Sequence, residues 1–441
     1  MYLQMGPAAR KVRIDTSKLR LLESEGEVTL PFPTRDRPGS DSPRLPGTEV
    51  LKRLHLFPGR EKLALNRHPW IFSGAVARIE GQPSAGELVE VRTAEGTFIA
   101  YGQYNPTSKI RVRLMEWAEG TAVEELWYRR RIEEAWALRA PLTVETDALR
   151  VFFSESDGIP GLVADRFGPY LVVQFLTSGA DREKALLTTL LARTIPGLKG
   201  IWEKSDGDGR RLEGLAAAEG LLWGEAPDGE IEITENGHRY LVDPASQKTG
   251  FYTDQRDNRR LVAPWLAGLR ILDAFTFTGG FAVAALAAGA AAVTLLDSSA
   301  DALAQARKNL ALGGWEPEEV LEGDAFQVLR DLKKRGETYG AVILDPPKLA
   351  TNRDHLDRAL RGYKDLNLQA LKLVEPGGFL ASFSCSGLVD FKTFREMIAF
   401  AAKDSGRRVD IVRQLHQAPC HPIRTSMPEA EYLKGVLLRV I

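Results

Sequence analysis

Three acids and one cysteine stand at the ends of predicted strands in the C-terminal half of the chain. Asp297, Asp324 and Asp345 each follow a short strand-like run, and Cys385 ends the run in EPGGFLASFSC. Carboxylates in such positions can accept hydrogen bonds from a ligand, and a thiolate can act as a nucleophile. Cysteine is also among the most buried residue types, so a packed thiol is the alternative for Cys385.

A glycine-containing loop accompanies these side chains. LDAFTFTGGF ends an earlier strand, and Gly279 and Gly280 open the helix after it. Glycine lets the chain turn sharply and lets a ligand approach the backbone closely. The loop lacks the pattern GxGxxG, which disfavours a dinucleotide site. Asp297 lies 18 positions after Gly279, a spacing at which a carboxylate can accept both ribose hydroxyls of a nucleoside.

Two of these acids also have a purely structural interpretation. Asp297 could cap the helix in SSADALAQARKN, although Ser298 or Ser299 could fill that position instead. Asp324 could accept from an adenine amino group, or it could cap the helix that follows it. Asp345 precedes two prolines that hold the loop extended, where an acid can accept from an amino group and sense a ring nitrogen.

The elements that must position these residues alternate between strands and helices. Residues 234–441 predict a doubly wound parallel sheet, in which ligands bind beyond the carboxyl ends of the strands. Residues 118–233 predict a smaller α/β domain with no catalytic constellation. There, Asp157, Asp165 and Arg166 are interpreted as turn and surface residues.

The N-terminal part differs in both composition and pattern. Residues 1–49 are rich in Pro, Arg, Asp and Ser and predict a poorly ordered extension. Residues 50–117 predict a small β-barrel of short strands separated by turns. This stretch holds ten Lys and Arg against six Glu. The local positive charge suits an RNA-binding surface as well as an ordinary solvated one.

Composition as a whole indicates a cytoplasmic protein. Lys and Arg total 58 against 59 Asp and Glu, which argues against bulk charge as the route to nucleic acid. The two cysteines, Cys385 and Cys420, make no disulfide framework. The N-terminus has no signal-peptide pattern, and the longest apolar stretch, residues 281–296, is too short for a membrane span.

Together, the strand-end motifs resemble those of S-adenosylmethionine-dependent methyltransferases. The chain is similar to the 23S ribosomal RNA cytosine-5 methyltransferases that carry an N-terminal PUA domain. The stretches that carry the resemblance are HPWIFSGAV, ESDGIPGLVADRFGPYLVVQ, QKTGFYTDQRDNR, LDAFTFTGGF, LDSSADAL, DPPK, GYKDLNLQALKLVEPGG and SCS. The resemblance implies a PUA barrel over 50–117, a central α/β domain over 118–233 and a Rossmann-like methyltransferase domain over 234–441.

The resemblance also implies roles for individual residues. Cys385 would add to carbon 6 of a cytosine, and Asp345 would hold the amino edge and ring nitrogen of that base. The residues expected to bind S-adenosylmethionine are Phe275, Thr278, Gly279, Gly280, Asp297, Ser298, Asp324, Ala325, Asp345 and Gln247. RNA contacts are expected from Arg67, Trp70 and Lys348, with 23S ribosomal RNA or a large-subunit assembly intermediate as the partner, and no metal is expected.

The chain departs from related patterns near two of these motifs. Some RNA cytosine-5 methyltransferases carry a second cysteine beside the fourth-strand motif, where this chain has DPPK. Ser246 stands in ASQKTG where glycine is expected, and Cys420 in APCHP matches no catalytic position. Two rival interpretations stay open: an amino-group methyltransferase acting on adenine or guanine, which needs no cysteine, and a methyltransferase fold that serves only as an RNA scaffold.

Overall fold

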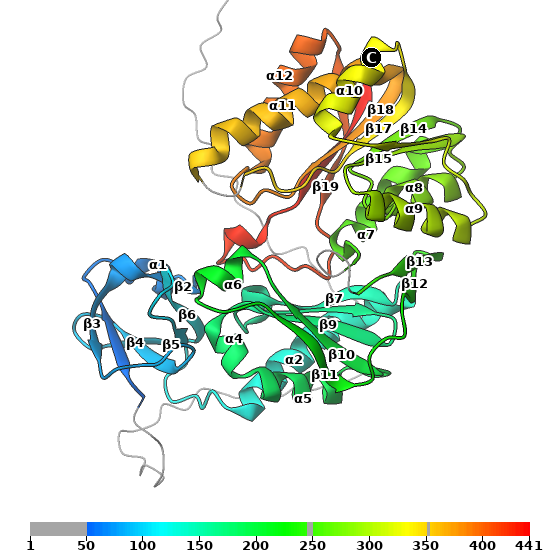
Figure 1. Cartoon of the computed structure of the whole chain (residues 1–441). Helices are drawn as coiled ribbons and strands as arrows, with labels where there is room; N and C mark the ends of the chain where they lie inside the picture. Colours follow the sequence, from blue (N-terminus) through cyan, green and yellow to red (C-terminus); the bar gives the residue numbers. More distant parts are fainter. Residues whose placement is uncertain (1–50, 245–249, 351–352) are drawn as a thin grey trace, which may run out of the picture. The chain divides into compact units, whose positions relative to one another are not determined.

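The computed structural model describes residues 51–244, 250–350 and 353–441, which belong to one compact unit (Figure 1). Gln247 and the predicted extension 1–49 lie outside the described residues. Sheets of six, five, two and seven strands follow one another along the chain. In the ranges described, no helix is both long and apolar enough to cross a membrane.

The N-terminal sheet has six strands in the order β2-β6-β5-β4-β1-β3. Alternate side chains along β4 and β6 enter its core, among them Val89, Val91, Val112 and Leu114. The strands are β1 (Arg53–Leu56), β2 (Trp70–Phe72), β3 (Val76–Glu80), β4 (Leu88–Arg92), β5 (Phe98–Tyr104) and β6 (Ile110–Glu116), and helix α1 (Lys62–Leu65) separates β1 from β2 along the chain. This is the β domain that the short-strand pattern predicts.

The central sheet has five strands in the order β11-β10-β9-β8-β7. These strands are β7 (Ala148–Phe153), β8 (Leu162–Phe167), β9 (Tyr170–Phe175), β10 (Gly200–Ser205) and β11 (Ala218–Gly224). The helices are α2 (Glu125–Arg139), α3 (Ser154–Asp157), α4 (Ser178–Arg182), α5 (Lys184–Thr194) and α6 (Asp208–Leu212). Ile132 of α2 and Leu187 and Leu191 of α5 share one core with Val151 and Val173 of the sheet, so these two helices cover one of its faces.

Two acids of the central domain, one at the end of α3 and one in β8, are not the surface residues that the sequence predicts. Asp165 in β8 is only 1% exposed and accepts hydrogen bonds from Arg150 at 2.9 and 2.8 Å. Asp157 is half-buried and accepts from the fully buried Arg139 at 2.8 and 2.7 Å. Both acids are ionic partners of arginines on neighbouring elements, a pairing that local sequence does not reveal. Arg166 is half-buried and donates to the Gly168 carbonyl at 2.8 Å.

A two-stranded hairpin, β12 (Ile231–Glu235) and β13 (His238–Val242), connects the central sheet to the C-terminal sheet. The domain boundary predicted after residue 233 falls inside β12. Ile233 and Tyr240 of the hairpin belong to a core that also contains Phe167 of the central sheet and Leu303 of the C-terminal part. The hairpin is therefore packed on both sides, and the domain boundaries stay a prediction.

The C-terminal sheet has seven strands in the order β16-β15-β14-β17-β18-β20-β19. The strands are β14 (Arg270–Ala274), β15 (Ala292–Asp297), β16 (Glu319–Glu322), β17 (Tyr339–Leu344), β18 (Val374–Ser384), β19 (Val409–His416) and β20 (Lys434–Val440). The first five of these are parallel, as the alternation predicts, but β20 runs antiparallel between β18 and β19. The strand order reverses between β14 and β17, so their carboxyl ends flank the topological switch point.

Helices cover both faces of the C-terminal sheet (Figure 1). They are α7 (Arg256–Val262), α8 (Gly280–Ala287), α9 (Ala300–Leu312), α10 (Ala325–Lys334), α11 (Leu356–Leu373) and α12 (Phe391–Ser405). Phe281 of α8 and Leu310 of α9 belong to the core on one face. Leu329 of α10, Tyr363 of α11 and Phe394 of α12 belong to the core on the other. This arrangement confirms the predicted doubly wound fold.

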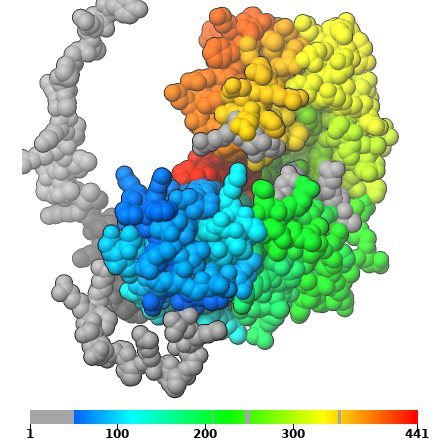
Figure 2. All heavy atoms as spheres, turned by 60° about the vertical axis from the view of Figure 1, so that its left-hand side comes forward, coloured from blue at the N-terminus to red at the C-terminus, as the bar shows by residue number. Residues whose placement is uncertain are grey.

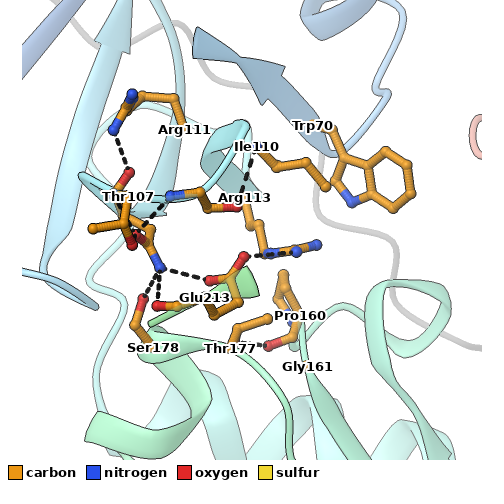
Figure 3. Close-up of polar contacts among 12 residues, drawn as sticks. Trp70, Thr107, Ile110, Arg111, Arg113, Pro160, Gly161, Thr177, Ser178 and Glu213 are labelled. Carbon is orange, nitrogen blue, oxygen red and sulfur yellow. Dashed lines mark hydrogen bonds and ion pairs between the residues drawn. The ribbon is translucent and has the colours of Figure 1, made fainter. Parts of the chain in front are cut away.

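Buried polar contacts join the N-terminal β domain to the central sheet (Figure 3). Arg113 of β6 donates to Glu155 at 2.6 Å and to Glu213 at 3.0 Å, and both acids are buried. The Trp70 indole donates to the same Glu155 at 2.9 Å. Asn105 donates to the Glu213 carboxylate at 2.8 Å. Figure 2 shows the N-terminal β domain in blue packed directly against cyan and green residues of the central sheet.

Replacing Arg113 with methionine is expected to lower the free energy of unfolding by about 3–5 kcal/mol, because Glu155 and Glu213 would stay buried without their cation. Urea unfolding of the full chain measures this. Arg53→Met is the matched control, since its pair with Glu90 is 3.1 Å long and partly exposed on the arginine side, and it should cost less than about 1 kcal/mol. Equal losses for the two variants would contradict the importance of the buried contact.

Candidate active site

The loop between β14 and α8 has an unusual backbone. Phe275 and Phe277 have φ angles of +63° and +49°, and Gly279, the N-cap of α8, has φ +78°. A non-glycine residue in this region costs of order 1–3 kcal/mol, and such residues concentrate at functional sites. A Cβ on Gly279 would lie 3.1 Å from the Ala306 side chain of α9. Glycine at this position therefore permits both the left-handed turn and close helix packing.

Asp273, the second-last residue of β14, hydrogen-bonds to this loop and to the first turn of α8. Its side chain is 1% exposed and accepts from the Thr276 hydroxyl at 2.7 Å and from the Ala282 N–H at 3.2 Å. Burial raises the pKa of Asp273 to about 7, and the nearby charge of Asp297 acts in the same direction. Asp273 is not among the predicted site residues, although its place near a strand end in LDAF is a signal of such a role.

Asp297 braces the same loop from the end of β15. Its Oδ2 accepts from the Phe277 N–H at 2.9 Å, and its Oδ1 accepts from the Ser299 N–H at 3.0 Å. Ser299, and not Asp297, is the N-cap of α9, since its hydroxyl accepts from the Ala302 N–H. Each carboxylate oxygen has a second acceptor position, so half-buried Asp297 can still accept from a ligand.

The remaining residues expected to bind the cofactor fall into two groups. Asp324 is exposed and is the N-cap of α10, since its Oδ1 accepts from the Phe326 N–H at 3.2 Å. Its Oδ2 can still accept a hydrogen bond from a ligand. Thr278 and Ala325 are buried, whereas Ser298 is exposed. The Thr278 carbonyl accepts from Asn309 of α9 at 2.8 Å, which ties the loop to that helix.

The structure brings Cys385 next to the segment that begins with Asp345. The strands before them, β17 and β18, are parallel neighbours, and the Cys385 Sγ lies 3.8 Å from the Pro346 carbonyl oxygen. Ser386 joins the two segments further, because its Oγ accepts from the Ala350 N–H at 3.2 Å and lies 2.8 Å from the Tyr363 hydroxyl. Cys385 is half-buried, one position beyond β18, as expected for a thiol at an open sheet edge.

Asp345 is half-buried at this edge. Burial raises its pKa to about 7, and the charges of Asp254 and Asp273 add to the rise. The Gln255 side chain lies beside Asp345 and partly offsets the rise in its pKa. The buried Gln255 Nε2 makes no well-formed hydrogen bond. Near neutral pH the Asp345 carboxyl is therefore partly protonated, so it can donate a hydrogen bond as well as accept one.

Lys434 of β20 lies on the other side of Cys385. It is 2% exposed and donates through Nζ to the Ser386 carbonyl at 2.7 Å and to the Val389 carbonyl. Burial lowers its pKa to about 8, and its electrostatic attraction to Cys385 opposes that change. Lys434 is not among the predicted site residues, although a lysine near the start of the apolar run LKGVLLRVI is unusual.

The helix after Cys385 contributes less positive potential than its position suggests. Helix α12 begins at Phe391, and its N-cap is Asp390, whose carboxylate accepts from the Thr393 N–H at 2.7 Å. The negative charge of this cap offsets the positive end of the helix dipole. Lys434, which interacts electrostatically with Cys385, can support a thiolate there.

The residues expected to contact RNA are in different surroundings. Lys348 is exposed beside the Asp345 segment, and Arg67 is exposed after α1. Trp70 is half-buried, and its indole N–H already donates to Glu155. Cys420 is fully buried, and burial raises its pKa to about 11, so it has the properties of an inert packed thiol. Within the described ranges, no group of three or more His, Cys, Asp or Glu side chains is arranged to hold a metal ion.

Comparisons with known proteins agree with this architecture. A model of PUA-like domains matches residues 54–117, and a model of S-adenosylmethionine-dependent methyltransferases matches residues 161–422. Ribosomal RNA large subunit methyltransferase I of Klebsiella pneumoniae strain 342 is 42% identical over 397 residues, which are 89% of this chain and 99% of that protein. The protein of the same name from Escherichia coli O157:H7 is 41% identical over 394 residues, covering 88% and 99%.

A solved structure has the same fold. SMU.776, described as a methyltransferase and complexed with SAH, superimposes with a TM-score of 0.76 at 18% identity, over 88% of this chain and 99% of that chain. A likeness at this level of identity extends to the arrangement of elements, including the N-terminal β domain and the methyltransferase sheet.

Proposed function

The chain belongs to the family of the ribosomal RNA large subunit methyltransferase I proteins, within the S-adenosylmethionine-dependent methyltransferases, and we propose that it methylates carbon 5 of a cytosine in 23S ribosomal RNA. The single observation that carries this proposal is the position of Cys385 beside the segment that begins with Asp345, with 3.8 Å between its Sγ and the Pro346 carbonyl. A thiol at that place is required by cytosine-5 chemistry and is superfluous for amino-group methylation.

The proposed reaction begins with the thiolate of Cys385. Carbon 5 of cytosine is too weak a nucleophile to accept a methyl group directly, so the thiolate first adds to carbon 6 of the ring. The addition places negative charge on carbon 5 and N3. Carbon 5 would then take the methyl group from the sulfonium, with the neutral thioether of the cofactor as the leaving group. A base must then remove the proton from carbon 5 of the methylated adduct, and the electron pair of that C–H bond re-forms the double bond to carbon 6 and expels the Cys385 thiolate.

Asp345 stabilises the adduct in this scheme. A protonated carboxyl can donate to N3 of the cytosine while its carbonyl oxygen accepts from the amino group. The pKa near 7 places both protonation states within reach at neutral pH. Lys434 is a positioning residue, because it holds the carbonyls of Ser386 and Val389 and carries its charge next to the thiol.

The site has the donors and acceptors that S-adenosylmethionine needs. The cofactor supplies a methyl group made electrophilic by a sulfonium charge. Asp297, with open acceptor positions, suits the ribose hydroxyls, and Asp324 suits the adenine amino group. Gly279, Gly280 and the strained loop before them would lie along the cofactor. The expected cellular location is the cytoplasm, where an rRNA substrate would be met.

Asp297→Ala is expected to weaken S-adenosylmethionine binding roughly 10- to 100-fold, because two charge-assisted hydrogen bonds would be lost. Calorimetry on the full chain measures the affinity. Asp297→Asn separates the loop contact from the ligand contact, since its amide oxygen can still accept from the Phe277 N–H. Asp301→Ala, on the exposed first turn of α9, is the matched control and should bind normally. Normal affinity of Asp297→Ala would remove the ribose assignment.

A further inference from the structure

A pocket of about 340 Å³ lies where three distant parts of the chain meet, and no step of the proposed reaction uses it. Arg67 and Trp117 come from the N-terminal β domain, Arg131 comes from α2, and Arg424 comes from the segment between β19 and β20. We call this the three-part pocket. Its size falls within the usual range for small-ligand sites, and its lining is rich in guanidinium groups.

Arg67 and Arg424, which are far apart in the sequence, both lie over the ring of Trp117. The guanidinium carbon of Arg67 lies 5.5 Å from the centroid of Trp117, and that of Arg424 lies 5.2 Å from it. The Trp117 indole is itself fixed by donation to the Ala64 carbonyl at 2.9 Å. Ser426 donates to the Arg67 carbonyl at 2.8 Å, which ties the two segments together. Arg67 adopts a φ of +66°, so its backbone is also constrained.

The carboxylates that line the three-part pocket already have partners, and two of them, Glu116 and Glu134, pair with Arg131 of the pocket itself. Glu134 pairs with Arg131 at 2.7 Å, and Asp157 pairs with Arg139 at 2.7 Å. Glu116 accepts from the Trp127 indole at 3.0 Å and from two backbone N–H groups.

Arg67 and Arg424 have no such partner. Over the stretches of chain that are described, no carboxylate comes within 4.0 Å of either guanidinium, and Arg424 donates only to the Glu155 carbonyl, at 3.0 Å. Burial and the charge of Arg131 lower the pKa of Arg424, the charge of Glu155 opposes this, and the charge of Arg67 adds to the lowering. The lining of the pocket thus holds three arginines and three acids, and within the described residues the guanidinium groups of Arg67 and Arg424 are the two without a carboxylate in ion-pair contact.

We propose that the three-part pocket binds a backbone phosphate of the RNA substrate through Arg67 and Arg424. A guanidinium presents a planar pair of N–H donors that matches two phosphate oxygens, and stacking on Trp117 orders both groups in advance. A bound phosphate would pair with the two guanidinium groups that have no carboxylate partner. This assignment rests on the proposed function for its choice of RNA over another anion, and it gives the expected RNA contact of Arg67 a specific partner in Arg424.

The test measures binding and not methyl transfer, so it can fail independently of the cytosine-5 assignment. A 23S ribosomal RNA transcript is titrated with the full chain at several salt concentrations. Arg67→Gln and Arg424→Gln should each weaken binding on the order of tenfold and reduce the slope of log affinity against log salt by about 1, and the double variant by about 2. Arg424→Lys should keep the slope of the wild type but lose part of the affinity.

Arg130→Gln is the matched control, since Arg130 neighbours Arg131 on α2 but is exposed and does not line the pocket. Arg130→Gln should change the RNA affinity and the salt slope less than Arg67→Gln or Arg424→Gln does. If the glutamine variants fold poorly, wild-type protein can be treated with phenylglyoxal, and RNA should protect Arg67 and Arg424 but not Arg130. Unchanged affinity and slope in the folded double variant, or no protection in the wild type, would overturn the proposal.

Discussion

Cys385→Ser should abolish methyl transfer to 23S ribosomal RNA, with a loss on the order of 10³-fold or more, the scale seen when an enzyme loses its nucleophile. A serine hydroxyl ionises far above neutral pH, so the alkoxide that would have to attack carbon 6 is hardly present. S-adenosylmethionine binding should survive, because the thiol lies beside Pro346 and not in the β14–α8 loop. Transfer of a labelled methyl group, followed by calorimetry of the same variant, separates these two results.

A covalent trap tests the same residue without relying on a rate. RNA that carries 5-fluorocytosine at the target should form a stable adduct with the wild-type protein, because fluorine blocks the final removal of a proton from carbon 5. Denaturing electrophoresis should show this adduct for the wild type and none for Cys385→Ser. Cys420→Ser is the matched control. Its thiol is fully buried and donates to the Thr253 carbonyl, so it is not available to a base and this variant should trap like the wild type.

The two rival activities give different outcomes in these experiments. Normal methylation by Cys385→Ser would refute the covalent mechanism and favour methylation of an adenine or guanine amino group, for which the acid at Asp345 would suffice. Failure of the wild type to methylate any ribosomal RNA or assembly intermediate would favour an RNA-binding scaffold. Bisulfite mapping of ribosomal RNA from a deletion strain would identify the modified nucleotide.

Asp345→Asn is expected to lower kcat by roughly 10²–10⁴-fold, the usual contribution of a group that transfers a proton in the transition state. The asparagine amide can still donate toward N3 and accept from the amino group, so substrate binding should change little. It cannot release a proton to the ring nitrogen, so the adduct loses most of its stabilisation. Single-turnover kinetics at saturating RNA measure the chemical step directly.

The pH profile gives this prediction a sign. As the pH rises through about 7, Asp345 loses the proton that it donates, and this loss limits wild-type activity on the alkaline side. The rising thiolate fraction works in the opposite direction, so the wild-type profile should be bell-shaped. Asp345→Asn should lack the fall on the alkaline side, and Asp357→Asn, on the exposed first turn of α11, should behave like the wild type. An unchanged kcat and an unchanged alkaline limb in Asp345→Asn would contradict the role.

Local sequence was sufficient for the positions of the site's main side chains. Hydrophobic runs bounded by turn-forming residues predict the parallel strands, and the carboxyl ends of parallel strands lie at one edge of a sheet. Asp297, Asp345 and Cys385 could therefore be expected near one another before any contact was known. The strained conformations of Phe275 and Phe277 could not be expected, because a φ above zero at phenylalanine is enforced by the surrounding bonds of Asp273 and Asp297.

What the sequence by itself determined, then, is the doubly wound sheet and the row of acids and thiol along its edge, because strand periodicity and strand ends are properties of neighbouring residues. Only the tertiary structure decided which charged groups face one another. Lys434 supports Cys385, Arg113 joins two buried acids, and Arg67 meets Arg424 over Trp117. Each of these contacts joins segments far apart in the chain. Their pairing depends on how whole elements pack, and no local pattern of residues records that choice.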